Sequence, residues 1–278
     1  MQELSKMRDY IILGAIQGVV DWLPISSEGV LVLSQMWLFD NQLGLSEMIK
    51  VALFLHLGSL FAVIVYFWSD IGKIIKVLFN YKKSASKDRS LLNFLLISSI
   101  FTGTFGLLIY LSIGTIEEDI LDLTGQAFMI LIGFLLLITS GMQFIANKKP
   151  KNKIRDIEDL TSKDAAITGL VQSAAVLPGF SRSGSTVSTL LLLKINDVDA
   201  LKISFFMGLP VILGGNIILN FDKLQGGIPE MAGLMTSFIF GILTIHFLMK
   251  IARKLSFAWF TLVFGFLTIS AAIVSVIF

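Results

Sequence analysis

The chain has 278 residues, of which 55% are hydrophobic and only 15% charged, and its mean hydropathy is +0.82. Soluble domains are about a quarter charged, so this composition excludes a disordered chain and argues strongly against a soluble globular protein. The formal net charge of +2 is small and dispersed, and therefore indicates no nucleic-acid partner. The chain has no cysteine, which excludes disulfides, thiolate metal sites and cysteine nucleophiles.

Six stretches are long and apolar enough to cross a membrane, since a transmembrane helix needs about 20 mostly apolar residues. In chain order they are Met48–Trp68, Leu91–Ile113, Ala127–Ala146, Leu201–Phe221, Ala232–Ile251 and Ser256–Phe278. Two further apolar stretches, Ile11–Ser34 and Ala165–Leu193, are interrupted by Pro, Gly and Ser. Broken helices at membrane depth are tolerated only where they are buried in protein or line a wet cavity, so we interpret both as re-entrant helical hairpins. The sequence therefore predicts an all-α integral membrane protein with six transmembrane helices and two re-entrant helical hairpins.

Basic residues predict how the chain is oriented in the membrane. The linkers Asp70–Ser90 and Asn147–Asp164 are rich in Lys and Arg, whereas the connection Gly114–Gln126 is acidic and has neither. Both basic linkers are therefore predicted to be cytoplasmic, so that the first hairpin opens outward and the second enters from the cytoplasmic side. In an alternative arrangement Ile11–Ser34 spans the membrane fully and the N-terminus lies inside.

The two hairpins share a sequence pattern in which Gly-x-x-Gln, at Gly14–Gln17 and Gly169–Gln172, is followed by Leu-Pro, Ser and Gly. Entry from opposite sides would make this an inverted-topology repeat, which places a site near the bilayer midplane where broken helices meet. Chance similarity among helix-breaking residues is the alternative. The predicted organisation is a single membrane domain, 1–278, with a first repeat of about 1–146, a cytoplasmic linker 147–164 and a second repeat of about 165–278.

In the second hairpin, the run Pro178–Thr186 predicts a phosphate site. An arginine within a membrane segment is costly and usually functional, and the guanidinium of Arg182 matches phosphate oxygens bidentately. Glycines beside it would turn the backbone tightly and expose N–H groups to an anion. The neighbours predicted to complete the site are Ser181, Ser183, Ser185, Thr186, Gly179 and Gly184. Alternatively Arg182 snorkels to the surface and the hydroxyls cap helices.

The first hairpin supplies Gln17, Asp21, Ser26, Ser27 and Glu28. Gln17 and Asp21 are four residues apart and so share one face of a helix. Asp21 and Glu28 could hold Mg²⁺ or Ca²⁺ together with phosphate oxygens, because hard cations prefer oxygen ligands. Asp21 could instead act as a base or an orienting group for a serine, and Glu28 could simply face water.

His56 lies well inside the first predicted span. It could relay a proton near neutral pH, or it could be a core histidine bonded to a neighbour. The sequence leaves both interpretations open.

The segment Gln17–Gly29 resembles the first signature of the undecaprenyl-pyrophosphate phosphatases, the bacitracin-resistance family. Pro178–Thr186 resembles the second signature, Pro-Gly-x-Ser-Arg-Ser-Gly-x-Thr, and the resemblance covers the whole chain in length, span pattern and motif placement. It implies a membrane phosphatase that removes the terminal phosphate from a polyprenyl pyrophosphate and so recycles the lipid carrier for cell-wall glycan synthesis. It also implies six spans, two re-entrant hairpins in an inverted repeat, and a divalent cation, Mg²⁺ or Ca²⁺.

By this resemblance Arg182 binds the pyrophosphate beside Ser181 and Thr186, and Ser27 is a nucleophile or a phosphate ligand next to Ser26. The acidic motif of the family falls on Gln17 and Asp21, which makes both implied metal ligands.

Two departures from the family pattern bear on catalysis. Asp21 is one methylene shorter than the usual Glu, and Val30 stands where the family has His. Valine cannot carry a proton, so His56, Asp21 or a metal-bound water would have to take that role, or the activity differs from that of the family.

We therefore expect a multi-pass enzyme of the plasma membrane whose active site opens to the outer face. Its expected partners are a polyprenyl pyrophosphate and membrane lipids, and a homodimer is compatible with the sequence. The alternative is a transporter or flippase that moves a polyprenyl phosphate or another anion on the same scaffold.

Overall fold

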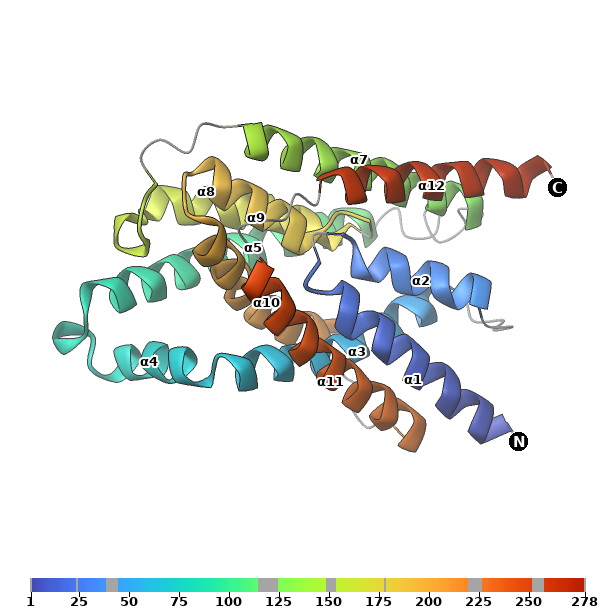
Figure 1. Cartoon of the computed structure of the whole chain (residues 1–278), viewed down its shortest axis with the longest axis horizontal. Coiled ribbons are helices and arrows are strands. Elements are labelled where there is room, and N and C mark those ends of the chain that lie inside the picture. The colour runs from blue at the N-terminus through green and yellow to red at the C-terminus, as the bar shows by residue number, and fades with distance from the viewer. Residues whose placement is uncertain are drawn as a thin grey trace.

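The computed structural model describes residues 2–23, 25–38, 45–114, 125–148, 154–177, 179–219, 227–251 and 258–277 (Figure 1). These residues form helices and no β-strand; a single isolated bridge pairs Arg155 with Ile195. The α-helices are α1 (Gln2–Val20), α2 (Ser27–Leu38), α3 (Leu45–Tyr66), α4 (Trp68–Phe79), α5 (Ser86–Gly114), α7 (Gly125–Lys148), α8 (Ser162–Ser173), α9 (Arg182–Leu192), α10 (Asp197–Leu219), α11 (Ile228–Ile251) and α12 (Ala258–Ile277). Three short 3-10 helices are η1 (Tyr81–Lys83), η2 (Ile157–Asp159) and η3 (Ala174–Val176).

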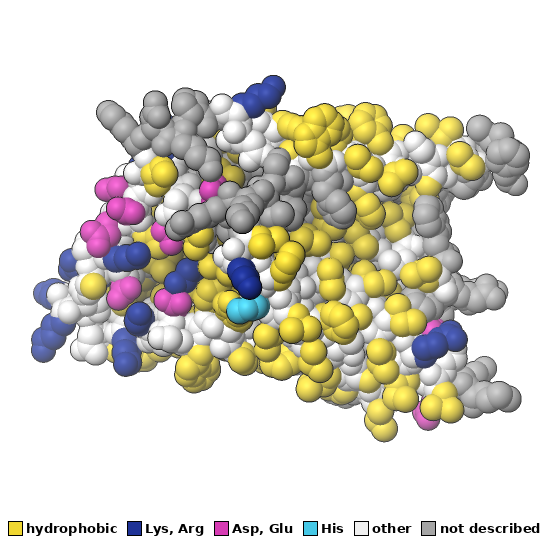
Figure 2. All heavy atoms as spheres, viewed as in Figure 1, with side chains coloured by type: hydrophobic (Ala, Val, Ile, Leu, Met, Phe, Trp, Pro, Cys, Tyr) yellow, Lys and Arg dark blue, Asp and Glu magenta, His cyan; other side chains and the backbone are white. Residues whose placement is uncertain are grey.

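Among the described residues, five helices are long and apolar enough to cross a membrane: α3, α5, α7, α10 and α11. They coincide with five of the six predicted spans. The sixth predicted span forms α12, whose apolar part within the described residues, Thr261–Val274, is shorter than a full crossing. Hydrophobic side chains cover the middle of the molecule in the view of Figure 2, while charged side chains gather at the end that carries α4 and the start of α5. This distribution is that of a multi-pass membrane protein.

Each predicted hairpin consists of two helices separated by a break. In the first, α1 ends at Val20 and α2 begins at Ser27; in the second, α8 and η3 are followed by a turn before α9 begins at Arg182. The prolines expected in these breaks, Pro24 and Pro178, lie outside the described residues, as do residues 115–124 of the acidic connection and 149–153 of the second basic linker. The breaks therefore fall where the sequence predicted them.

The first basic linker contains helices that the sequence did not predict, because α4 and η1 occupy most of it. Ile71 and Ile74 pack against the main apolar core and Val77 is buried, while the lysines between them are exposed. Twelve residues are too few to cross a membrane, which is why the hydropathy of this segment did not distinguish a helix from a linker.

The first helix of each hairpin packs against a long helix of the other half of the chain. In α1, a side chain at Gly14 would collide with the backbone of Gly233 in α11, and in α8 a Cβ at Gly169 would lie 2.5 Å from the carbonyl oxygen of Ser98 in α5. Glycine is required at both positions because the two backbones approach so closely. These are the two glycines that begin the shared Gly-x-x-Gln pattern.

The N-terminus of α8 is fixed by Thr161, whose hydroxyl accepts from the backbone N–H of Asp164. The Asp164 carboxylate in turn accepts from Arg155 at 2.7 Å. Burial alone would raise the pKa of Asp164, but the hydrogen bonds from Arg155 and Thr161 outweigh it and lower that pKa. Arg155 also donates to the carbonyl oxygen of Leu193, after α9, and so ties the two ends of the second hairpin together.

Candidate active site

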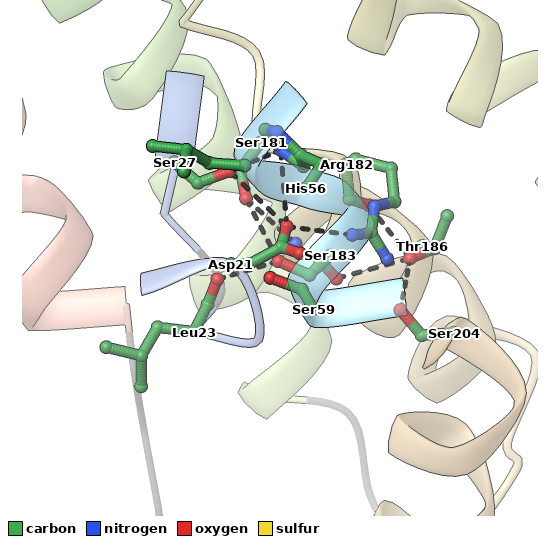
Figure 3. Close-up of polar contacts among 12 residues, drawn as sticks. Asp21, Leu23, Ser27, His56, Ser59, Ser181, Arg182, Ser183, Thr186 and Ser204 are labelled. Carbon is green, nitrogen blue, oxygen red and sulfur yellow. Dashed lines mark hydrogen bonds and ion pairs between the residues drawn. The ribbon is translucent and has the colours of Figure 1, made fainter. Parts of the chain in front are cut away.

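The breaks of the two hairpins meet and bond to each other. The backbone N–H of Gly179 donates to Ser26 Oγ at 3.1 Å, and Ser183 Oγ donates to the carbonyl oxygen of Leu23 at 2.7 Å (Figure 3). In both bonds the donor belongs to the second hairpin and the acceptor to the first. The two bonds together fix the position of one hairpin against the other. All side chains of the candidate site lie around this junction.

A serine hydroxyl caps the N-terminus of each helix that follows a break, α2 and α9. Ser26 Oγ accepts from the N–H of Gly29 at 3.2 Å, and Ser181 Oγ accepts from the N–H of Gly184 at 3.0 Å. Such caps satisfy backbone donors that a helix N-terminus leaves free. Gly179 has a φ of +102°, which favours glycine, and a Cβ there would lie 2.6 Å from Ile132 Cα.

These contacts change how the predicted phosphate cradle is understood. The N–H groups of Gly179 and Gly184, which we expected to face an anion, both donate to serine hydroxyls. Ser26 and Ser181 supply those acceptors, and Ser183 donates to Leu23. The structure therefore gives these five residues a role in shaping the junction.

The hydroxyl of Thr186 is also bonded within the protein. It bonds to the carbonyl oxygen of Arg182 at 2.8 Å and lies 2.6 Å from Ser204 Oγ of α10. Ser185 Oγ likewise donates to the carbonyl oxygen of Arg182, at 3.1 Å. Both hydroxyls thus bond within the first turn of α9, and Thr186 also joins α9 to α10. Arg182 is the charged group of the second signature that reaches the first hairpin.

Asp21 lies at the centre of the site, just after α1, and is only 3% exposed. Its Oδ1 accepts from Arg182 Nη2 at 3.0 Å, and lies 3.4 Å from Ser27 Oγ and 3.5 Å from His56 Nε2. Figure 3 shows these groups converging on one carboxylate. Its second oxygen, Oδ2, is buried and has no hydrogen-bond partner among the described residues.

Ser27 and His56 form a close pair although they are far apart in the chain. Ser27 Oγ lies 3.1 Å from His56 Nε2, and His56 Nδ1 lies 2.7 Å from the carbonyl oxygen of Ala52. A carbonyl only accepts, so Nδ1 donates to Ala52. In the neutral ring this leaves the lone pair on Nε2, where it can accept from Ser27. This is the arrangement of a hydroxyl nucleophile with its general base.

Arg182 is the first residue of α9, and its guanidinium is almost entirely buried. Nη2 bonds to Asp21, whereas Nη1 is buried and has no partner within the part of the chain that the structure describes. A donor in that condition is costly unless a ligand satisfies it, and phosphate oxygens suit a guanidinium. The second half of the guanidinium is therefore available to an anion.

Two residues that the sequence analysis missed help to hold Arg182. The ring of Trp22 lies 5.2 Å from the guanidinium carbon, within range of a cation–π contact. Gly208 of α10 leaves space for the side chain, because a Cβ there would lie 2.9 Å from Arg182 Cζ. The contact of Trp22 with Arg182 could have been suspected, because Trp22 directly follows Asp21 in the sequence. Nothing in the sequence indicated the role of Gly208.

The predicted metal ligands lie in or beside this site. Gln17 is fully buried one helical turn before Asp21, and neither atom of its amide has a hydrogen-bond partner. Glu28, in the first turn of α2, is half-buried and interacts electrostatically with His56, Asp21 and Arg182. The unpartnered oxygens of Gln17 and Asp21 are of the kind that hard cations prefer.

The donor set is nevertheless small. Within the described residues no group of three His, Cys, Asp or Glu side chains could hold a metal by itself. A cation held by one or two carboxylates completes its shell with waters and substrate phosphates, and the residues present fit that mode.

Comparisons with known proteins agree along nearly the whole chain. The family model described as bacitracin resistance protein BacA matches residues 10–269. The undecaprenyl-diphosphatase of Methanococcoides burtonii is 34% identical over 271 residues, which cover 96% of this chain and 98% of that protein. The undecaprenyl-diphosphatases of Thermosipho africanus and Bacteroides fragilis are 36% and 33% identical, and cover 89% and 93% of this chain and 92% and 96% of their own lengths.

Proposed function

The chain belongs to the bacitracin resistance protein BacA family, and on that basis we propose that it is a membrane undecaprenyl-diphosphatase. The reaction converts undecaprenyl pyrophosphate and water to undecaprenyl phosphate and inorganic phosphate, and so recycles a lipid carrier for cell-wall glycan synthesis. The observation that carries the proposal is the junction of the two hairpins, where Ser27, His56, Asp21 and Arg182 converge in one buried place. Nothing in the comparisons favours the transport alternative.

In the proposed mechanism, Arg182 binds the pyrophosphate through its unpartnered Nη1 while Nη2 stays on Asp21. Ser27 Oγ attacks the terminal phosphorus and its proton passes to His56 Nε2. The bond to the bridging oxygen breaks, and undecaprenyl phosphate leaves with that oxygen. His56 passes the proton of the serine to the departing undecaprenyl phosphate. Water then attacks the phosphorus held on Ser27, His56 takes the proton that the water gives up, and that proton returns to Ser27 Oγ as inorganic phosphate leaves. Catalysis of this kind rests on positioning and electrostatic stabilisation.

We propose that Gln17, Asp21 and Glu28 hold Mg²⁺ or Ca²⁺ beside the phosphates. The unpartnered oxygens of Gln17 and Asp21 support this assignment. When bound, the cation would neutralise phosphate charge. Ser26, Ser181, Ser183, Thr186, Gly179 and Gly184 are proposed to shape the phosphate site from the surrounding backbone.

We also propose six spans, with α12 as the sixth, and two re-entrant hairpins related by an inverted repeat within one domain. The reciprocal packing of α1 on α11 and of α8 on α5 supports this topology. The concentration of basic side chains near α4 supports a cytoplasmic position for that end of the molecule (Figure 2). On that orientation the site opens to the outer face of the plasma membrane. A homodimer is a further arrangement that we propose to test by the mass of the purified protein.

The test is phosphate release from undecaprenyl pyrophosphate by the full chain purified in detergent. We expect release that a chelator abolishes and that Mg²⁺ or Ca²⁺ restores. Arg182→Lys keeps the charge but loses the planar fork that can bond to Asp21 and to a phosphate at once, and we expect it to lower the rate roughly 10- to 100-fold. Arg155→Lys, which alters an arginine away from the site, is the matched control. A folded wild-type protein that releases no phosphate with either cation would refute the proposal.

A further inference from the structure

Helix α4 has three distinct sides. One side faces the protein, where Val77 is buried and Asp70 binds Lys202 at 2.8 Å. A second side is apolar and exposed: Trp68, Ile75 and Phe79 are 71%, 49% and 80% exposed. The third side carries Ser69, Lys73 and Lys76, all of them exposed. The first side packs α4 against the rest of the protein. The apolar and basic sides together form an amphipathic surface that faces outward.

The exposed apolar side of α4 continues a stripe that begins on α3. Phe61 and Val65 are half exposed on α3, and Trp68, Ile75 and Phe79 follow at helical spacing. On α3, a transmembrane helix, such residues face lipid. Helix α4 lies at the end of the molecule where charged side chains gather (Figures 1 and 2). This continuity places the apolar side of α4 against the same bilayer.

The charges around α4 indicate the chemistry of what covers it. The basic side chains from α4 to the first turn of α5 are Lys73, Lys76, Lys82, Lys83, Lys87 and Arg89. Asp70 and Asp88 are the acidic ones in that stretch, and Asp70 is already paired with Lys202. A second copy of this chain would bring the same positive charge against it, so charge opposes self-association through this face. An acidic surface would be attracted.

We propose that α4 is an interfacial helix that binds anionic phospholipid. Trp68, Ile75 and Phe79 enter the boundary between headgroups and acyl chains, and Lys73, Lys76, Lys82 and Lys83 bind the acidic headgroups. An aromatic residue at each end of the helix suits this depth, because aromatic rings favour the membrane interface. This binding surface lies outside the candidate active site and does not depend on the proposed reaction.

The test uses the absence of cysteine from the chain. A spin label is attached to Ile75→Cys on the apolar side or to Ser69→Cys on the lysine side of the full chain. The protein is placed in vesicles of phosphatidylcholine with or without phosphatidylglycerol. Collision of the label with oxygen, which concentrates in the bilayer, is compared with its collision with a water-soluble nickel complex. The ratio reports the depth of each label.

We expect the label at position 75 to lie in the bilayer when phosphatidylglycerol is present, while the label at 69 stays exposed to nickel. Changing Lys73, Lys76, Lys82 and Lys83 to Gln should make the depth of the label at position 75 depend less on phosphatidylglycerol. Each lysine removed should lower the partitioning of α4 into the anionic interface by roughly fivefold. The matched control changes four exposed lysines elsewhere, Lys148, Lys163, Lys194 and Lys250, and should keep the dependence. The proposal is overturned if the label at 75 is as exposed to nickel as the label at 69, or if both sets of lysines have equal effects.

Discussion

His56 Nε2 lies beside Ser27 and offers it a ring nitrogen, since α2 has no histidine. Valine stands at position 30, where the family resemblance places a histidine, and a valine cannot move a proton. His56 reaches the same hydroxyl from α3, and the carbonyl oxygen of Ala52 fixes its tautomer. Asp21, which also lies near Nε2, can stabilise the imidazolium that forms when His56 takes the proton.

Replacing His56 with Gln tests this assignment. Glutamine can still form hydrogen bonds but cannot accept the proton, so kcat for phosphate release should fall by about 10²- to 10⁴-fold with little change in KM. His246→Gln is the matched control, because His246 is exposed and contacts Tyr66 rather than the site. Equal kcat values for the His56 variant and the wild type would remove His56 from the mechanism.

At the scale of the helix, the breaks were predictable and the contacts across them were not. Prolines, glycines and serines indicate where a helix stops, so α1, α2, α8 and α9 are found near the positions that the sequence favoured. The pairing of Ser27 with His56 depends on the rotation of α3 against α2, which is set by packing between distant segments. The amphipathic helix α4 was missed because its apolar residues are fewer than a membrane span requires.

Glycine at the contacts of α1 and α8 is expected to be essential for packing. Gly14→Ala and Gly169→Ala each place a Cβ against a neighbouring backbone, which cannot yield as a side-chain end would, and each should cost about 1–3 kcal/mol. Gly103→Ala in α5 is the matched control, because no atom lies within 4 Å of its added Cβ. Thermal unfolding of the purified variants measures the difference. An equal midpoint for all three variants would show that the close packing is not required.

At the scale of the whole molecule, each half of the chain provides what the other lacks. The first hairpin carries the hydroxyl and carboxylate of the site, the second carries the guanidinium, and the hydrogen bonds of Ser26 and Ser183 join them. Composition and the two signature motifs were sufficient to predict a membrane protein and its family. The meeting of the hairpins was expected from the proposed repeat, whereas the use of their serines as caps and joints follows only from the three-dimensional arrangement.

The most direct test of this account is a double-mutant cycle across the two hairpins. Phosphate release from undecaprenyl pyrophosphate is measured for Ser27→Ala, for Arg182→Ala and for the double variant. Residues that act as one unit have strongly non-additive effects, so each single variant should lose most of the activity and the double variant should be hardly slower than the slower single variant. Single variants that keep the wild-type rate, or effects that multiply as they do for independent sites, would contradict a shared active site.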